Sequence, residues 1–272
     1  MEFCSTYLTK KIKINLFSFG SKYLTKKEFS FKGDDYLSKA LYMDDSYLKE
    51  WDAEIKSVSQ DKFIVLDRTA FFPKGGGVEW DTGKIRTENG QEYNVVYTGK
   101  FSGEISHEVD KKGIKVGDKV HCELDWDRRY LLMRYHTGTH VLSGVFFKEY
   151  NLKITGNQLT TEKGRVDLNM EEMDIESFKN AINRSNEIIK KNLPVEIYYL
   201  SREEAEKDTD LFKLAKGFDH DIDTIRIVDI KGFDRQADGG CHVKNLKEIG
   251  KINFKDAINK GKNFKRVYFT IE

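Results

Sequence analysis

Apolar and polar residues alternate in a series of short segments between residues 53 and 124, with Gly, Asp or Asn between the segments. Alternation with a period of two predicts strands that bury one face. We expect strands at 53–57, 62–67, 92–97, 103–108 and 119–124. Short, evenly spaced strands with turn residues between them are typical of small β-barrels, so we predict a barrel in this part of the chain.

The apolar pattern changes to a helical period after residue 126. One helix is predicted over 127–150 with Asp127 as its N-cap, and a second over 173–191, which Pro194 would end. Ser201 followed by Glu204 fits the capped start of a further helix. Strands are expected at 152–154, 165–170, 195–200, 224–230, 249–254 and 267–271. The second half of the chain is therefore predicted to be α+β.

The predicted fold class is α+β, with a small amino-terminal β-barrel domain at 39–126 and an α+β domain at 127–272. A length of 272 residues suits two domains of ordinary size. Residues 1–38 are rich in lysine and could form a basic arm for RNA, although an extension without a function is the simpler interpretation. The formal net charge is only +1, so any nucleic-acid contact must come from local basic patches.

The sequence gives no indication of a membrane or secreted protein. There is no run of about 18 apolar residues, and the amino terminus lacks a long apolar segment followed by a cleavage site. Three scattered cysteines do not make a disulfide framework. We therefore expect a cytoplasmic protein that has no membrane partner.

Two histidines, His136 and His140, occupy positions i and i+4 of the helix predicted at 127–150. Side chains at this spacing project from one face, so both imidazoles could bind one metal ion. A third, His242, follows two glycines and would complete the ligand set of a catalytic zinc. A lone histidine would more simply be a core residue, but a pair at this spacing favours a metal site. Thr137 replaces the glutamate base of HExxH proteases, which argues against peptidase chemistry.

Two glycine-rich segments accompany the histidines. Residues 238–243 place a carboxylate, a thiol and an imidazole within five positions, although an ordinary hairpin turn has similar glycines. In residues 66–83, Thr69 and two phenylalanines precede a triple glycine. No Gly-Lys-Ser/Thr follows, so this segment is not a P-loop. It could line a small polar pocket, or it could be a flexible hairpin loop.

Three patterns follow one another along the chain: Asp-x-Thr-x-Phe-Phe-Pro-x-Gly-Gly-Gly at 67–77, Arg-x5-Arg-x-His-Thr-x-Thr-His at 128–140, and Asp-Gly-Gly-x-His-Val followed by Glu-Ile-Gly at 238–250. Together they resemble the editing domain of alanyl-tRNA synthetase and, more closely, its free-standing relatives, the AlaX trans-editing proteins. The resemblance spans about residues 42–270. It implies a barrel domain with the glycine-rich motif, followed by a zinc-binding α+β editing domain of the threonyl/alanyl-tRNA synthetase type. It also implies hydrolysis of serine, and sometimes glycine, wrongly attached to alanine tRNA. No aminoacylation domain precedes this one in the sequence, so we expect action in trans.

The resemblance assigns the metal ligands residue by residue. His136, His140 and His242 match the family's zinc-binding histidines. Many members carry a cysteine four residues before the last histidine, where this chain has Asp238. We favour Asp238 over Cys241 as the fourth ligand, because Asp238 keeps the spacing and a carboxylate oxygen can bind zinc. An oxygen in place of a thiolate makes a harder site, which would suit a weaker or different metal.

The resemblance also implies substrate contacts. Thr69 would recognise the hydroxyl of the serine moiety, which alanine lacks. The residues expected around the substrate are Thr69, Gly75, Gly76, Gly77, Gln236 and Gln158. Arg128, Arg129 and Arg134 lie near the histidine motif and could contact tRNA phosphates, or could equally form salt bridges on the surface.

The sequence therefore predicts a zinc-dependent aminoacyl-tRNA deacylase with one Zn2+ per chain. Its substrate would be Ser-tRNA(Ala), with Gly-tRNA(Ala) as a second candidate, and its partner would be the acceptor end of tRNA(Ala). The alternative is a catalytically decayed tRNA-binding module of the same fold, with Asp238 as the sign of a lost metal site. Threonyl-tRNA editing and an unrelated zinc hydrolase fit the glycine-rich segment less well.

Overall fold

The computed structural model describes residues 38–212 and 223–272. The lysine-rich segment predicted at 1–38 lies outside the described residues, apart from Ser38. None of the helices in the described ranges combines the length and apolar character needed to cross a membrane.

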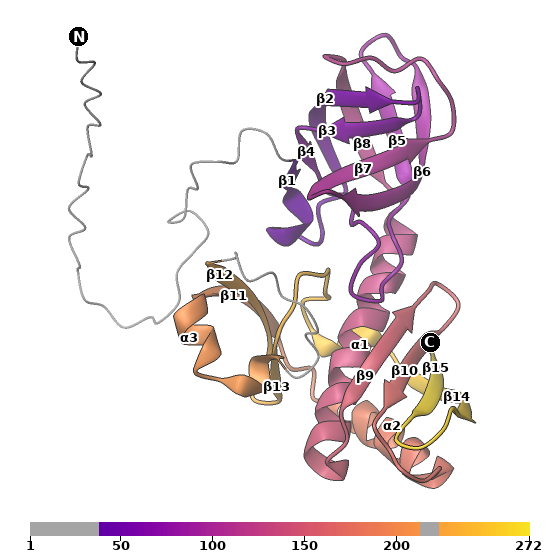
Figure 1. Cartoon of the computed structure of the whole chain (residues 1–272), viewed down its shortest axis with the longest axis vertical. Helices are drawn as coiled ribbons and strands as arrows, with labels where there is room; N and C mark the ends of the chain where they lie inside the picture. Colours follow the sequence, from indigo (N-terminus) through magenta and orange to yellow (C-terminus); the bar gives the residue numbers. More distant parts are fainter. Residues whose placement is uncertain (1–37, 213–222) are drawn as a thin grey trace, which may run out of the picture.

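Six antiparallel strands close into a β-barrel in the first half of the described chain (Figure 1). They are β2 (Glu50–Ser59), β3 (Phe63–Leu66), β5 (Gly83–Thr87), β6 (Glu92–Phe101), β7 (Glu104–Val109) and β8 (Lys119–Leu124). They pair in the closed order β2-β3-β7-β6-β5-β8, which leaves no open sheet edge. Inward-facing residues alternate with outward ones, and Ile55, Ile64 and Ile85 are fully buried inside. The predicted barrel is confirmed.

Strand β5 is the barrel strand that the sequence pattern does not predict. Its single large apolar residue is Ile85, which points into the barrel. Lys84 and Arg86 point outward and form ion pairs with Glu92 of β6. A strand with one apolar position has too little alternation to be recognised without its neighbours.

Three α-helices and two antiparallel sheets form the described part of the second half of the chain. The four-stranded sheet has the order β14-β15-β10-β9 and the three-stranded sheet the order β11-β12-β13. The strands are β9 (Ile154–Leu159), β10 (Gly164–Leu168), β11 (Val195–Ser201), β12 (Thr224–Ile230), β13 (Asp234–Ala237), β14 (Ile252–Asn259) and β15 (Lys265–Ile271). The helices are α1 (Trp126–Tyr150), α2 (Ile175–Lys190) and α3 (Arg202–Glu206), where Ser201 and Glu204 form the predicted capping box. This half is α+β, as predicted.

Short elements connect these parts of the structure. Strand β1 (Lys39–Ala40) pairs in parallel with β4 (Arg68–Thr69), at the start of the glycine-rich segment. Three 3-10 helices complete the description: η2 (Leu41–Met43), η3 (Thr209–Phe212) and η4 (Leu246–Ile249). Helix η2 leads from β1 into the barrel, and η4 follows the segment that carries His242.

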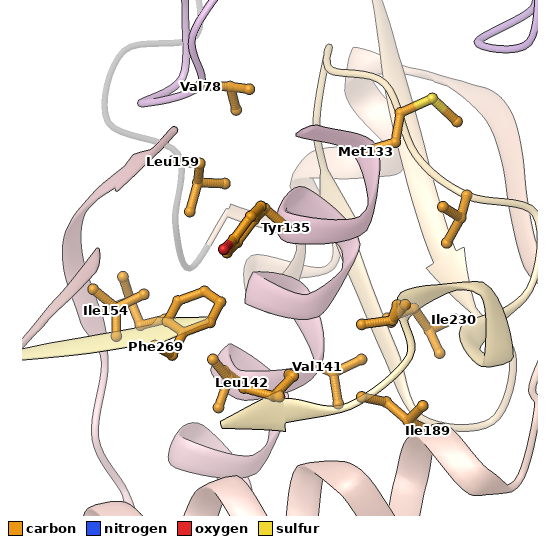
Figure 2. Close-up of a cluster of buried hydrophobic side chains, with 14 of the residues drawn as sticks. Val78, Met133, Tyr135, Val141, Leu142, Ile154, Leu159, Ile189, Ile230 and Phe269 are labelled. Carbon is orange, nitrogen blue, oxygen red and sulfur yellow. The ribbon is translucent and has the colours of Figure 1, made fainter. Parts of the chain in front are cut away.

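Helix α1 runs from the barrel down between the two sheets (Figure 1). Every residue from 135 to 146 is buried, so the helix has no exposed face over this stretch. Figure 2 shows Tyr135 and Leu142 beside Phe269, while Val141 lies towards Ile189. Any polar side chain in the middle of α1 must therefore find its partners inside the protein.

The start of α1 corrects one expectation. The N-cap is Asp125, whose carboxylate accepts a hydrogen bond from the main-chain N–H of Arg128 at 3.2 Å. Asp127, predicted as the cap, lies in the first turn, where its negative charge interacts favourably with the helix dipole.

Candidate metal centre

Four side chains from three segments meet beside the middle of α1. His136 and His140 project from consecutive turns of the helix, Asp238 follows the end of β13, and His242 lies in the segment before η4. One ligand atom of each residue lies within 4.8 Å of all the others. Nε2 of His242 is 3.0 Å from the Asp238 carboxylate, and the corresponding distances are 3.4 Å for His136 and 3.7 Å for His140.

The three imidazoles are buried and pack directly on one another. Their ring centroids are 4.3 Å apart for His136 and His242, 4.7 Å for His140 and His242, and 5.1 Å for His136 and His140. Burial and the neighbouring His136 hold the pKa of His242 well below its usual range, against the effect of Asp238. Burial alone would raise the pKa of Asp238, but His136 and hydrogen bonds from all three histidines hold it well below its usual range.

These residues fit a divalent metal ion such as zinc. Ligands in a tetrahedron about 2.0–2.1 Å from zinc lie about 3.3 Å from one another, close to the carboxylate–imidazole distances here. Three neutral imidazoles and one carboxylate are also a suitable donor set for such an ion. Asp238 keeps 21% of its side chain exposed, so the cluster is reached from solvent on that side.

The turn that carries Asp238 and His242 depends on Gly240. A Cβ atom at this position would lie 2.4 Å from Cε1 of His136, so a larger residue would displace the imidazole. The N–H of Gly240 donates to the Asp238 carboxylate at 2.6 Å. The glycine therefore brings the backbone close to one ligand while orienting another.

Thr137 orients His242, a role that the sequence does not reveal. Its hydroxyl oxygen lies 3.1 Å from Nδ1 of His242 and accepts a hydrogen bond from the N–H of Val243 at 3.2 Å. With Nδ1 bonded to Thr137, Nε2 of His242 is the nitrogen that faces Asp238. Outer partners of this kind fix the tautomer and direction of a metal-binding imidazole. The residue that replaces the protease glutamate thus supports the cluster from behind.

Cys241 lies outside the cluster. It is buried, and burial raises the pKa of its thiol to about 11. The thiol lies close to Ser46, Arg129 and Asp81, where barrel and helix residues meet. Of the two candidates for the fourth ligand, the structure brings Asp238 to the histidines.

The two glutamines predicted to border the substrate differ in position. Gln236 of β13 is buried near the cluster, and its amide nitrogen donates to Asp234 at 2.6 Å and to Ser143 at 3.4 Å. Ser143 lies on α1 three residues after His140, one turn beyond the cluster. Gln158, on β9, is exposed. Of the two glutamines, Gln236 is therefore the one that contacts α1, one turn beyond the histidines.

Thr69 points into the barrel instead of onto an open surface. Its side chain is fully buried, and its hydroxyl donates to Nε2 of His107 at 2.9 Å, because Nδ1 of that ring donates to the carbonyl of Ile64. The same hydroxyl accepts from the N–H of Phe71 at 3.1 Å. In this structure Thr69 has no exposed surface with which to meet a serine hydroxyl.

The glycine-rich loop contacts the second half of the chain. Val78 forms a bridge with Leu159 at the end of β9, and the two side chains are neighbours in Figure 2. Gly77 has a φ of +82°, and a Cβ there would lie 2.2 Å from Asn157. Gly75 is half-buried and Gly76 is exposed. The loop therefore connects the barrel to the sheet beside α1.

The three arginines before the histidine motif already have partners within the protein. Arg129 is buried, forms an ion pair with Asp81 and donates to the carbonyls of Ser46 and Ala70. Of the two roles expected for Arg129, a tRNA phosphate contact or a salt bridge, the structure shows the salt bridge, since Asp81 and the two carbonyls occupy all of its guanidinium nitrogens. Arg128 and Arg134 are half-buried; Arg128 pairs with Glu79 at 2.9 Å, and Arg134 donates to the main chain of Ile249 and Glu272. 

Comparisons with known proteins identify the family to which this chain belongs. The profile described as class II (A) tRNA synthetases matches residues 11–128, and the profile of the threonyl and alanyl tRNA synthetase second additional domain matches residues 225–268. The alanine–tRNA ligase of Sulfurisphaera tokodaii is 36% identical over 219 residues, which are 79% of this chain but 24% of the ligase.

Shorter relatives match almost end to end. The alanyl-tRNA editing protein AlaX-M of Methanosarcina barkeri is 47% identical over 241 residues, covering 86% of this chain and 99% of that protein. AlaX-M of Saccharolobus solfataricus is 42% identical over 238 residues, covering 87% of this chain and 100% of that protein. Because this identity extends over nearly the whole length of these relatives, the chain belongs to the AlaX-M family of alanyl-tRNA editing proteins.

Proposed function

We propose that this protein is a zinc-dependent deacylase that removes serine from tRNA(Ala), with Gly-tRNA(Ala) as a second substrate. The observation that supports this most directly is the meeting of His136, His140, His242 and Asp238 beside a solvent opening. The relatives named alanyl-tRNA editing proteins provide the substrate class, because the bond to be cut would be the ester between amino acid and tRNA. The partner would be the acceptor end of tRNA(Ala).

The chain's own residues would hold the metal and restrict its surroundings. A zinc ion bound here would supply a Lewis acid that polarises the ester carbonyl or lowers the pKa of a water molecule to about 7. Asp238 would keep the negative charge of its carboxylate on the solvent side of the imidazoles. Thr137 and Gly240 would keep His242 and Asp238 in place while the ester is bound.

Selectivity would come from polar groups around the amino-acid moiety. A site that forms a hydrogen bond with a substrate hydroxyl can reject an analogue without one by a large factor. Gln236 is the polar residue closest to this role, because Asp234 fixes its amide nitrogen and its carbonyl oxygen has no partner among the described residues. Thr69 could contact the substrate hydroxyl only after its own hydrogen bond to His107 is broken.

The experiment is deacylation of Ser-tRNA(Ala), Gly-tRNA(Ala) and Ala-tRNA(Ala) by the purified protein, before and after treatment with a chelator. We expect rapid loss of serine, little loss of alanine, and loss of activity with the chelator that added Zn2+ restores. A rate of hydrolysis that is unchanged by the chelator would contradict the metal-dependent mechanism. Binding of tRNA without hydrolysis of any substrate would favour the decayed binding module instead.

A further inference from the structure

Arg226 lies beside the metal cluster with an unusual set of partners. It is on β12 and is 4% exposed. Nη1 donates to the main-chain carbonyl of Asp238 at 2.8 Å, and Nε donates to that of Met43 at 3.3 Å. In return, the N–H of Asp238 donates to the carbonyl of Arg226 at 3.1 Å. The guanidinium is therefore tied directly to a residue of the cluster.

The charge of Arg226 is not balanced within residues 38–212 and 223–272. Both of its hydrogen-bond partners are neutral carbonyls, and Nη2 is buried without any partner. Arg129, the other buried arginine nearby, shows the usual solution, since Asp81 neutralises it. A buried cation without a counter-charge is costly, whereas an arginine that awaits an anion keeps its donors free.

We propose that Arg226 binds the phosphate group of the terminal nucleotide of the tRNA. This assignment rests on the proposed function, because it takes the substrate to be an aminoacylated 3′ end. Guanidinium groups are well suited to phosphate oxygens, which accept charge-assisted hydrogen bonds from the planar fork of N–H donors. Nη2 provides the free donor, and the neighbouring half-buried Met43 and exposed Gly239 border the opening at Asp238.

The position of Arg226 favours a phosphate over the oxyanion that forms during ester hydrolysis. Arg226 contacts the main-chain carbonyl of Asp238, whereas the carboxylate of Asp238 faces the three histidines. An oxyanion would form on the side of the histidines. A phosphate one sugar away from the ester would instead lie beside the cluster, where the guanidinium is.

The first test is binding, which needs no hydrolysis. The affinities of 5′-AMP and adenosine for the zinc-loaded protein are measured by calorimetry. We expect AMP to bind about ten-fold or more tightly than adenosine, as for a charge-assisted hydrogen bond, and the difference to disappear in Arg226→Gln. Arg184→Gln removes the same charge from the exposed surface of α2 and should keep the preference. Equal affinity of the unaltered protein for AMP and adenosine would overturn the proposal without using any variant.

The second test separates phosphate recognition from catalysis. Hydrolysis of Ser-tRNA(Ala) is compared with hydrolysis of the seryl ester of adenosine, which has no phosphate. In Arg226→Gln we expect KM for the tRNA to rise about ten-fold or more with kcat nearly unchanged, and no effect on the adenosine ester. Arg226→Lys keeps the charge and should recover part of the loss.

Zinc content and thermal unfolding of each variant show whether the fold and the cluster remain intact. An equal fall in kcat for both substrates would identify Arg226 as an oxyanion donor and reject the phosphate role. Unchanged kinetics and AMP binding would also reject it. If the unaltered protein hydrolyses neither substrate, the proposed function fails, while the comparison of AMP with adenosine still tests the phosphate site.

Discussion

The barrel and the second half of the protein both bury histidine, with opposite results. In the barrel, His107 has a separate partner for each nitrogen, the carbonyl of Ile64 and the hydroxyl of Thr69. Beside α1, three imidazoles share one carboxylate and pack on one another. Burial alone therefore does not make a histidine a ligand. The imidazoles of the second group instead converge on one carboxylate, in an arrangement that could hold a metal ion.

The largest effect should come from removing one imidazole of the converging group. His140→Ala should reduce deacylation to background and lower the zinc content of the purified protein, because two histidines and a carboxylate remain. Circular dichroism should still show a folded protein. His121→Ala, an exposed histidine on the barrel, is the matched control and should change neither quantity. Normal zinc content in His140→Ala would show that His140 is not a zinc ligand and would contradict the distinction between the two groups of histidines.

Changing the shared carboxylate tests its part in the site. Asp238→Ala should weaken zinc binding by at least the roughly 10–100-fold that loss of an outer partner costs. Asp238→Cys should retain zinc, because a thiolate is also a zinc ligand. Cys241→Ser should leave zinc affinity unchanged, since Cys241 lies outside the cluster. Competition with a chromophoric chelator measures all three; a loss of zinc in Cys241→Ser alone would reverse the assignment of the fourth ligand.

Two threonines on α1, Thr137 and Thr139, test whether a hydrogen bond to His242 is needed to orient its imidazole. Thr137→Val removes the partner of Nδ1 of His242 and should weaken zinc binding by roughly 10-fold. Thr139→Val is the matched control, because the hydroxyl of Thr139 donates to the carbonyl of Tyr135 one turn earlier and, among the described residues, to none of the metal cluster. Its zinc affinity should be close to that of the unaltered protein. Equal affinities in both variants would deny Thr137 its role.

The smallest effect on zinc binding and deacylation is expected at the separately satisfied histidine, which acts on stability instead. Burial lowers the pKa of His107 from an unfolded value of about 6.5 to about 4. Between these values the unfolded chain binds a proton that the folded barrel excludes, so stability is lost as pH falls from 6.5 to 4, by roughly 3 kcal/mol. His107→Gln should remove this part of the slope. Unfolding temperature against pH for both proteins measures it; parallel curves would contradict the prediction.

How far the site could be predicted depends on the sequence distance between partners. The i, i+4 spacing places His136 and His140 on one face of a helix. Asp238 is selected by the resemblance to the AlaX proteins, because it stands four residues before His242, where many members carry a cysteine ligand. The structure brings these four together. Arg129 and Thr69 behave differently, because their partners Asp81 and His107 lie 48 and 38 residues away. No local pattern indicates that either side chain would be buried.

The same limit applies to the fold. The barrel and the buried helix follow from alternation and helical period, since many residues contribute to each pattern. Strand β5 has one apolar position and takes its place only between β6 and β8. Arg226 lies in a strand that the sequence predicts correctly, but its alternation says nothing of a guanidinium without a counter-charge.

The ion pair between Arg129 and Asp81 has a consequence for attempts to isolate either half of the protein. The guanidinium belongs to the first turns of α1, while the carboxylate and the carbonyl of Ala70 belong to the glycine-rich segment. A fragment that starts at residue 127 would keep the arginine but lose Asp81, Ala70 and Ser46, which cover its guanidinium and accept its hydrogen bonds. Truncation at the apparent boundary would therefore destabilise the helix that carries His136 and His140, and the shortest useful expression fragment must retain the barrel.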